Sequence, residues 1–321
     1  MNDPRLPLWV TPAKDEPAHG ILIRLAERNG IESSTRIPRM TGLNLSRLRL
    51  GRGVDRLAAI IKCDVAEIMH STPVVSENSI FVRGEDVGSK RRGGRPIRRL
   101  CPQCVSESAH HRFWYDLEFI TTCPEHGRNL VHTCSCGRDL SWDDVRISKC
   151  RHCDDGDVAL IPGTPVDPDI TEMDRWVLGR LGVGKPEPFP LFDQMALCHA
   201  QHMIGMIGIL EIKGYEERWL RPQDLEESDS EVRARGFRVL KQNQLDDVLD
   251  RVYEGFRSSR SYMPETIKNA YGWFGDWVED LRSRSLAVHF GEILITNAAR
   301  KFQIKEKELR RVPHMKQAPA S

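Results

Sequence analysis

Eight side chains that commonly bind metal ions lie close together in the middle of the chain. All cysteines except Cys63 and Cys198 fall between Cys101 and Cys153. A CxxC-type turn places two side chains about 2.3 Å from one metal ion, and two such turns joined by a loop complete a tetrahedral site. The spacing therefore predicts two zinc ions, one bound by Cys101, Cys104, Cys123 and His126, the other by Cys134, Cys136, Cys150 and Cys153.

Residues beside these ligands favour the same assignment. Pro102 and Pro124 each follow the first ligand of a turn and restrict its backbone. Gly137 stands where a metal-binding turn needs a positive φ angle. The cysteines also belong to a chain that begins without a signal-peptide pattern, and in a reducing compartment such a cluster indicates metal binding rather than disulfides.

Some histidines leave alternatives open. The first pair of the second group has one residue fewer between its cysteines than usual, so His132 or His152 could replace a cysteine as a ligand. By contrast, His110 and His111 lie in the middle of the loop between Cys104 and Cys123. We expect these two at the surface.

The predicted sites favour a structural role over catalysis. A catalytic zinc ion keeps three protein ligands and one open position for water, whereas four ligands close each predicted site. A zinc deaminase needs His-x-Glu followed by Pro-Cys-x-x-Cys, but this chain has Glu125-His126 and Cys101-Pro102 in the wrong order. No phosphate-binding glycine loop or nucleophile elbow is found in the sequence. The sequence predicts that the protein is not an enzyme.

A basic segment, residues 83–99, precedes the metal ligands. Such a run of charge is usually a solvated loop, but it can also follow a phosphate backbone. The candidates for nucleic-acid contact are Lys90, Arg91, Arg92 and Arg95, which surround the flexible pair Gly93-Gly94. A rival basic surface consists of Arg36, Arg39, Arg47 and Arg49. The net charge of +1 does not distinguish between them.

Short helices are expected to position this rival surface. In residues 19–30 the apolar side chains share one face, and Asn29-Gly30 would end the helix. A second helix begins near Val54, and Asp64 can cap a third helix after a tight turn. Helix, turn and short helix form a helix-turn-helix-like unit.

The predicted fold class is mainly α. The apolar content of 40% is ordinary for a globular protein, and the stretch from Met195 to Ile212 is too short and too polar to span a membrane, so we expect a cytoplasmic protein. A capping box at Ser228 and Glu231 and an apolar stripe from Ile267 to Leu281 predict a helical C-terminal region. The expected parts are a helix-turn-helix-like block at 1–82, a basic linker at 83–99, a double zinc module at 100–162, a helical domain at 163–300 and a flexible tail at 301–321.

Several of these motifs together resemble the TniQ family of bacterial transposon target-selection proteins. The resemblance rests on Arg24-Leu25-Ala26-x-x-Asn29-Gly30, Arg99-Leu100-Cys101-Pro102-Gln103-Cys104, Trp114, Thr122-Cys123-Pro124-Glu125-His126-Gly127, Cys134-Ser135-Cys136-Gly137 and Cys150-Arg151-His152-Cys153. These elements occur in the order of the family. Residues 15–20 depart from it, because the family usually has Glu-Ser after Gly or Pro there.

The resemblance implies a non-catalytic adaptor in the bacterial cytoplasm. Such adaptors bind DNA or a guide-RNA effector complex, as in CRISPR-associated transposons, and connect it to an AAA+ ATPase that recruits the transposase. A homodimer is among the arrangements that the resemblance implies, and no membrane partner is expected. The alternative from the residues themselves is a stand-alone transcriptional regulator, in which the helix-turn-helix-like unit reads DNA and the zinc module stiffens it.

Overall fold

A computed structural model of the chain describes residues 6–31, 36–76, 79–89, 97–144, 146–153, 156–218, 220–221, 224–260, 262–283 and 288–303. It contains two compact units, residues 1–201 and 202–321, which are described separately below. Within the described ranges, every helix is too short or too polar to cross a lipid bilayer. The structure is mainly helical, as the sequence predicted.

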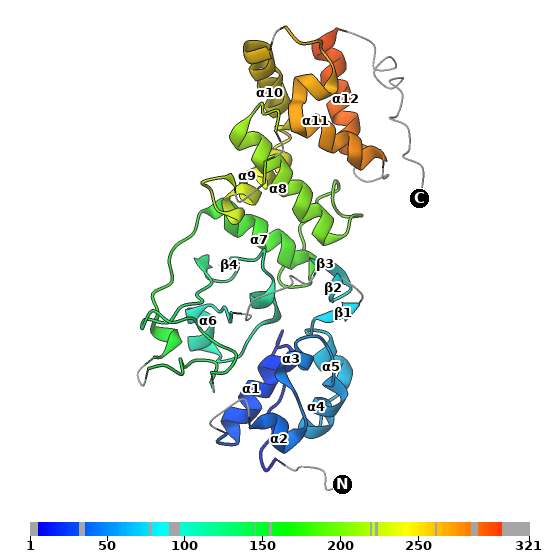
Figure 1. Cartoon of the computed structure of the whole chain (residues 1–321). Helices are drawn as coiled ribbons and strands as arrows, with labels where there is room; N and C mark the ends of the chain where they lie inside the picture. The colour runs from blue at the N-terminus through cyan, green and yellow to red at the C-terminus, as the bar shows by residue number, and fades with distance from the viewer. Residues whose placement is uncertain are drawn as a thin grey trace. The chain divides into compact units, whose positions relative to one another are not determined.

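The first unit begins with five short helices around one apolar core (Figure 1). They are α1 (Ala18–Arg28), α2 (Ile37–Thr41), α3 (Leu45–Leu48), α4 (Val54–Ile61) and α5 (Val65–Met69). Helix α1 ends where the sequence predicted, with Gly30 in the left-handed region at φ 66°. Asp64 caps α5 by accepting a hydrogen bond from the backbone N–H of Ala66 at 2.9 Å. The predicted pair of helices is therefore present, whereas its helix-turn-helix role in DNA binding stays a prediction.

A three-stranded antiparallel sheet follows these helices, and the sequence analysis did not predict it. Its strands are β1 (Val74–Ser76), β2 (Ser79–Val82) and β3 (Glu85–Ser89). Arg83 and Gly84 form the two-residue turn between β2 and β3, both with positive φ, as the tightest hairpin turns require. The guanidinium of Arg83 pairs with Asp15, donates to the Leu181 carbonyl at 2.8 Å and stacks on Phe113. Thus the first residues of the basic segment 83–99 are structured.

The central part of the first unit is irregular, with few regular elements. These are α6 (Pro102–Glu107), η1 (Phe113–Asp116), β4 (Thr122–Cys123), β5 (Arg128–Asn129), η2 (Val158–Leu160) and α7 (Pro168–Arg180). Strands β4 and β5 form a short antiparallel hairpin. Asp174 fastens α7 to this hairpin, because its Oδ2 accepts hydrogen bonds from the backbone N–H of Thr121 and from both the N–H and hydroxyl of Thr122.

The second unit is helical. Helix α8 (Leu197–Lys213) runs across the boundary between the units and is followed by α9 (Asp229–Lys241), α10 (Leu245–Arg260), α11 (Ile267–Ser283) and α12 (Val288–Phe302). Ser228 and Glu231 form the predicted capping box at the start of α9. Helices α10, α11 and α12 pack side by side in Figure 1. The predicted apolar stripe of α11 is buried at Ile267, Tyr271, Phe274 and Val278.

Candidate metal centres

The first group of predicted ligands converges on one point. Cys101 and Cys104 lie at the start of α6, Cys123 lies in β4, and His126 lies in the turn between β4 and β5. The Nδ1 atom of His126 is 3.5, 3.4 and 3.4 Å from the Sγ atoms of these three cysteines, in chain order. A tetrahedral zinc site would separate sulfur and nitrogen ligand atoms by about 3.5 Å, given Zn–S and Zn–N bonds of about 2.3 and 2.0 Å. The four side chains could therefore hold Zn²⁺ almost as they stand.

A neighbouring carboxylate orients the histidine of this group. The Nε2 atom of His126 lies 2.9 Å from Oε1 of Glu107 in α6. When the N–H at Nε2 donates a hydrogen bond to Glu107, Nδ1 carries the lone pair that faces the three sulfur atoms. Metal-binding histidines are usually fixed by such a carboxylate. The three cysteines are fully buried, so the first site has little access to water.

The second group also comes together, but nearer the surface. The Sγ atoms of Cys134 and Cys153 are 3.5 Å apart, and those of Cys136 and Cys150 are 3.9 Å apart. Tetrahedral geometry would separate two sulfur ligands by about 3.8 Å. All four ligand atoms lie within 4.8 Å of one another, although Cys136 is exposed. Gly137 has the positive φ that the sequence predicted, at 80°.

The alternative ligands of the second site lie outside this group. The side chain of His132 is exposed and contacts the hydroxyl of Thr133 at 3.0 Å and the carboxylate of Asp139 at 3.4 Å. His152 contributes its backbone N–H, which donates to the sulfur of Cys150 at 3.4 Å. The structure thus brings together the four cysteines rather than either histidine.

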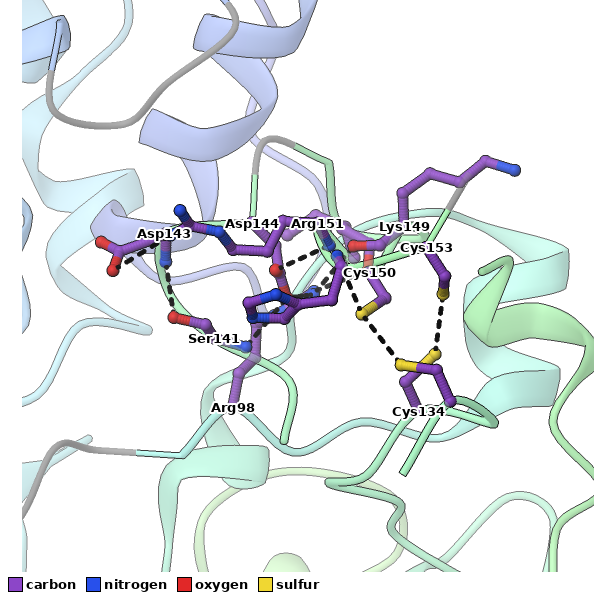
Figure 2. Close-up of polar contacts among 12 residues, drawn as sticks. Arg98, Cys134, Ser141, Asp143, Asp144, Lys149, Cys150, Arg151 and Cys153 are labelled. Carbon is purple, nitrogen blue, oxygen red and sulfur yellow. Dashed lines mark hydrogen bonds and ion pairs between the residues drawn. The ribbon is translucent and has the colours of Figure 1, made fainter. Parts of the chain in front are cut away.

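One buried ion pair shapes the loop that carries Cys150. Figure 2 shows Arg98 beneath this loop, with its guanidinium donating to Oδ2 of Asp144 at 2.7 Å. Both side chains are fully buried. The Asp144 carboxylate also accepts hydrogen bonds from the backbone N–H of Ser141 at 2.8 Å and of Arg151 at 3.1 Å. The Arg98–Asp144 pair therefore holds the loop that carries Cys150 at both ends, near Ser141 and near Arg151.

The surface position expected for His110 and His111 is wrong. His110 is 6% exposed and His111 is fully buried. Nε2 of His110 lies 3.1 Å from the backbone carbonyl oxygen of Lys14. The physical reason lies in the next residues, since Phe113, Trp114 and Tyr115 fill the core of the unit and draw the loop inward.

The basic segment supplies structural contacts at its described end. Lys90, Arg91, Arg92 and Arg95 lie outside the described residues. Arg99 donates three hydrogen bonds to the backbone carbonyls of Tyr115, Leu117 and Ile120, at 3.1, 2.6 and 3.0 Å. Together with the buried Arg98, this arginine serves the packing of the unit rather than an external partner.

The rival basic surface divides into exposed and half-buried members. Arg36, Arg39 and Arg47 are exposed, and Arg49 is half-buried above the ring of Trp142. Sequence reasoning missed the exposed Arg52 and Arg56; the proximity of Arg56 to α2 depends on the tertiary fold. The Arg56 guanidinium lies beside Gly42 at the end of α2. Within the described ranges, no ion pair engages the exposed arginines of this block.

Comparison with known proteins agrees with the motifs. Residues 7–130 match the TniQ family model, which confirms the resemblance. The match includes the five N-terminal helices and the first metal-ligand group, and it ends before Cys134. The curated proteins gave no match to the chain.

Proposed function

Because residues 7–130 form a TniQ-family domain, we propose that the chain is a non-catalytic adaptor that selects target sites for transposition. In this proposal it binds DNA or a guide-RNA effector complex and recruits an AAA+ ATPase, which in turn brings the transposase. The family match is the observation that carries the proposal, since it relates the chain to transposition. Cutting and joining of DNA are left to the partner enzymes.

The two cysteine groups would each bind one zinc ion in a structural role. Four ligands close each site, so the ion would have no open position for water or substrate. Instead it would hold α6 against the β4–β5 hairpin in the first site and the loops around Cys134 and Cys150 in the second. In a region with so little regular structure, metal binding would supply much of the folding free energy.

The exposed arginines of the N-terminal helices support a nucleic-acid surface. Arg36 and Arg39 belong to the α2 segment, Arg47 to α3 and Arg56 to α4. The position of the Arg56 guanidinium beside Gly42 brings α4 and α2 together at this surface. Arginine pairs well with phosphate because its planar fork donates two parallel hydrogen bonds. Lys90, Arg91, Arg92 and Arg95 remain candidates for additional backbone contacts.

Transposition in cells that carry the partner genes tests the adaptor. Deleting the gene should abolish targeted insertion, and a variant with Arg36, Arg39, Arg47 and Arg56 changed to Gln should reduce it strongly. In a binding assay, each lost phosphate contact should lower the slope of log binding constant against log salt concentration by about one unit.

A control variant neutralises exposed basic residues of the second unit, namely Arg218, Arg251, Arg257 and Lys268. Cells with this variant should show normal targeted insertion. Normal insertion after deletion would contradict the adaptor and favour the regulator, which predicts altered transcription instead.

A further inference from the structure

A third cluster of metal-binding side chains lies outside the two cysteine groups. Nε2 of His19 in α1 is 2.8 Å from Oδ2 of Asp116, and Nε2 of His111 is 3.2 Å from the same oxygen. The three ligand atoms lie within 4.8 Å of one another. About 3.3 Å would separate ligand atoms around a tetrahedral zinc ion with bonds of about 2.0 Å. The distances are therefore close to those of a metal site.

The two histidines are buried without enough hydrogen-bond partners. His19 is 1% exposed and His111 is fully buried. Nε2 of His111 makes no hydrogen bond in the described part of the chain, although it lies 3.2 Å from a carboxylate oxygen that already bonds to His19. The Nδ1 atoms of both rings also lack partners there, so no hydrogen bond fixes the tautomer of His111, whereas His19 bonds to Asp116 through Nε2. A cation between the rings and the carboxylate would use the Nε2 lone pair of both.

Protons would compete weakly for these ligands. Burial lowers the pKa of His111 to about 4, and it also lowers the pKa of His19 even though Asp116 opposes the shift. Burial thus favours the uncharged form of both imidazoles, which is the form that binds metal ions.

Neighbouring side chains close the cluster and hold its carboxylate. The ring of Trp142 stands edge-on to both histidines, with centroids 4.8 and 4.7 Å away. Arg49 lies over Trp142 and its guanidinium is 4.0 Å from Oδ1, the other oxygen of Asp116. That position would leave Oδ2 for the metal while Oδ1 faces the arginine, as partners of ligating carboxylates commonly do.

From this geometry we propose that His19, His111 and Asp116 bind a third divalent cation, with Zn²⁺ the best match. Two imidazoles and one carboxylate suit zinc and its neighbours in the transition series, whereas Ca²⁺ and Mg²⁺ prefer sets of oxygen ligands. Three protein ligands leave a fourth position that a water molecule would fill. Because both imidazoles are buried, a substrate would have little access to the ion. The ion would act as a cross-link that fastens α1 to the loop that leads into η1.

Zinc content of the full-length protein tests this site. After dialysis against metal-free buffer, the wild-type chain should retain three zinc ions, and Asp116→Asn and His111→Gln should each retain two. His132→Gln removes an exposed histidine and should leave three. Cobalt substitution separates the sites, because only the cysteine groups give thiolate-to-cobalt charge-transfer absorption.

The wild-type protein alone can overturn the proposal, even if the variants fail to fold. Two metal ions with the full thiolate-to-cobalt absorption would show that the cysteine sites are occupied and the histidine cluster is only a hydrogen-bonded junction. A third cobalt ion that binds without adding charge-transfer absorption would support the cation site. Loss of the thiolate absorption itself would instead contradict the proposed zinc sites.

Discussion

At the scale of single residues, Arg98 is buried and supports the fold, although the sequence pattern placed it in a basic linker. Arg98 stands at the end of a basic run, yet it is buried against Asp144. Nothing in the local sequence distinguishes it from Lys90 or Arg91, because its partner lies 46 residues away. The grouping of the candidate metal ligands was easier to predict, since their spacing is set by local turns.

Breaking the Arg98–Asp144 pair from one side should be costly. Arg98→Met leaves a buried carboxylate without its counter-charge, and Asp144→Leu leaves a buried guanidinium, so each should lose about 3–5 kcal/mol of unfolding free energy. The double variant should lose less than the sum, because neither charge is then stranded. Urea denaturation of the metal-loaded protein measures all three.

A surface pair provides the matched control. Arg151 and Asp143 lie 3.6 Å apart with partly exposed side chains, so Arg151→Ala should cost no more than about 1 kcal/mol. Equal losses for Arg98→Met and Arg151→Ala would mean that burial gives the inner pair no special role.

At the scale of elements, local signals predicted the helices better than the sheet. Asn29-Gly30, Asp64 and the Ser228 capping box lie at helix ends because each satisfies backbone groups within its own turn. Strands β2 and β3 are short, and β3 begins with Glu85 and Asp86. Their position depends on long-range contacts such as Arg83 with Leu181, which no periodicity reveals.

Two glycines allow α8 and α9 to cross closely in the second unit. A Cβ at Gly208 would lie 1.9 Å from the Val232 carbonyl oxygen, and one at Gly236 would lie 1.9 Å from that of Ile204. Gly→Ala in a helix normally stabilises by up to about 1 kcal/mol. Here Gly236→Ala should instead lower the free energy of unfolding by about 1–3 kcal/mol, as overpacking does. Thermal denaturation should show a lower midpoint.

Gly205 serves as the control for this crossing. It lies in the same helix as Gly208, but the nearest atom to an added Cβ is 3.8 Å away, in the Arg233 side chain. Gly205→Ala should therefore keep or raise the thermal midpoint. A Gly236→Ala variant as stable as Gly205→Ala would contradict the close approach of the two backbones.

At the scale of the whole molecule, the metal-ligand region and the N-terminal helices are interlocked. Phe113 donates its backbone N–H to the Asp15 carbonyl at 3.0 Å, and His110 lies 3.1 Å from the Lys14 carbonyl. Arg83 adds an ion pair with Asp15 and a contact with Phe113. From the sequence we placed these residues in three separate parts, the N-terminal block, the basic linker and the zinc module. A sequence gives the spacing of residues along the chain but not the contacts between distant segments.

Removing the proposed zinc ions should therefore unfold more than the ligand loops. With the ligands released, the loop from Ser108 to Leu117 would lose its anchors at α6 and β4, and the contacts of Asp15 and Lys14 would be lost with it. The second unit has its own core around Phe256, Tyr271 and Phe274. On adding a strong chelator, hydrogen exchange should accelerate throughout α1–α7, while α10 and α11 keep their protection and added zinc restores the rest. Retained protection in α1 and α4 after complete metal loss would show that the N-terminal helices fold without the metal-binding region.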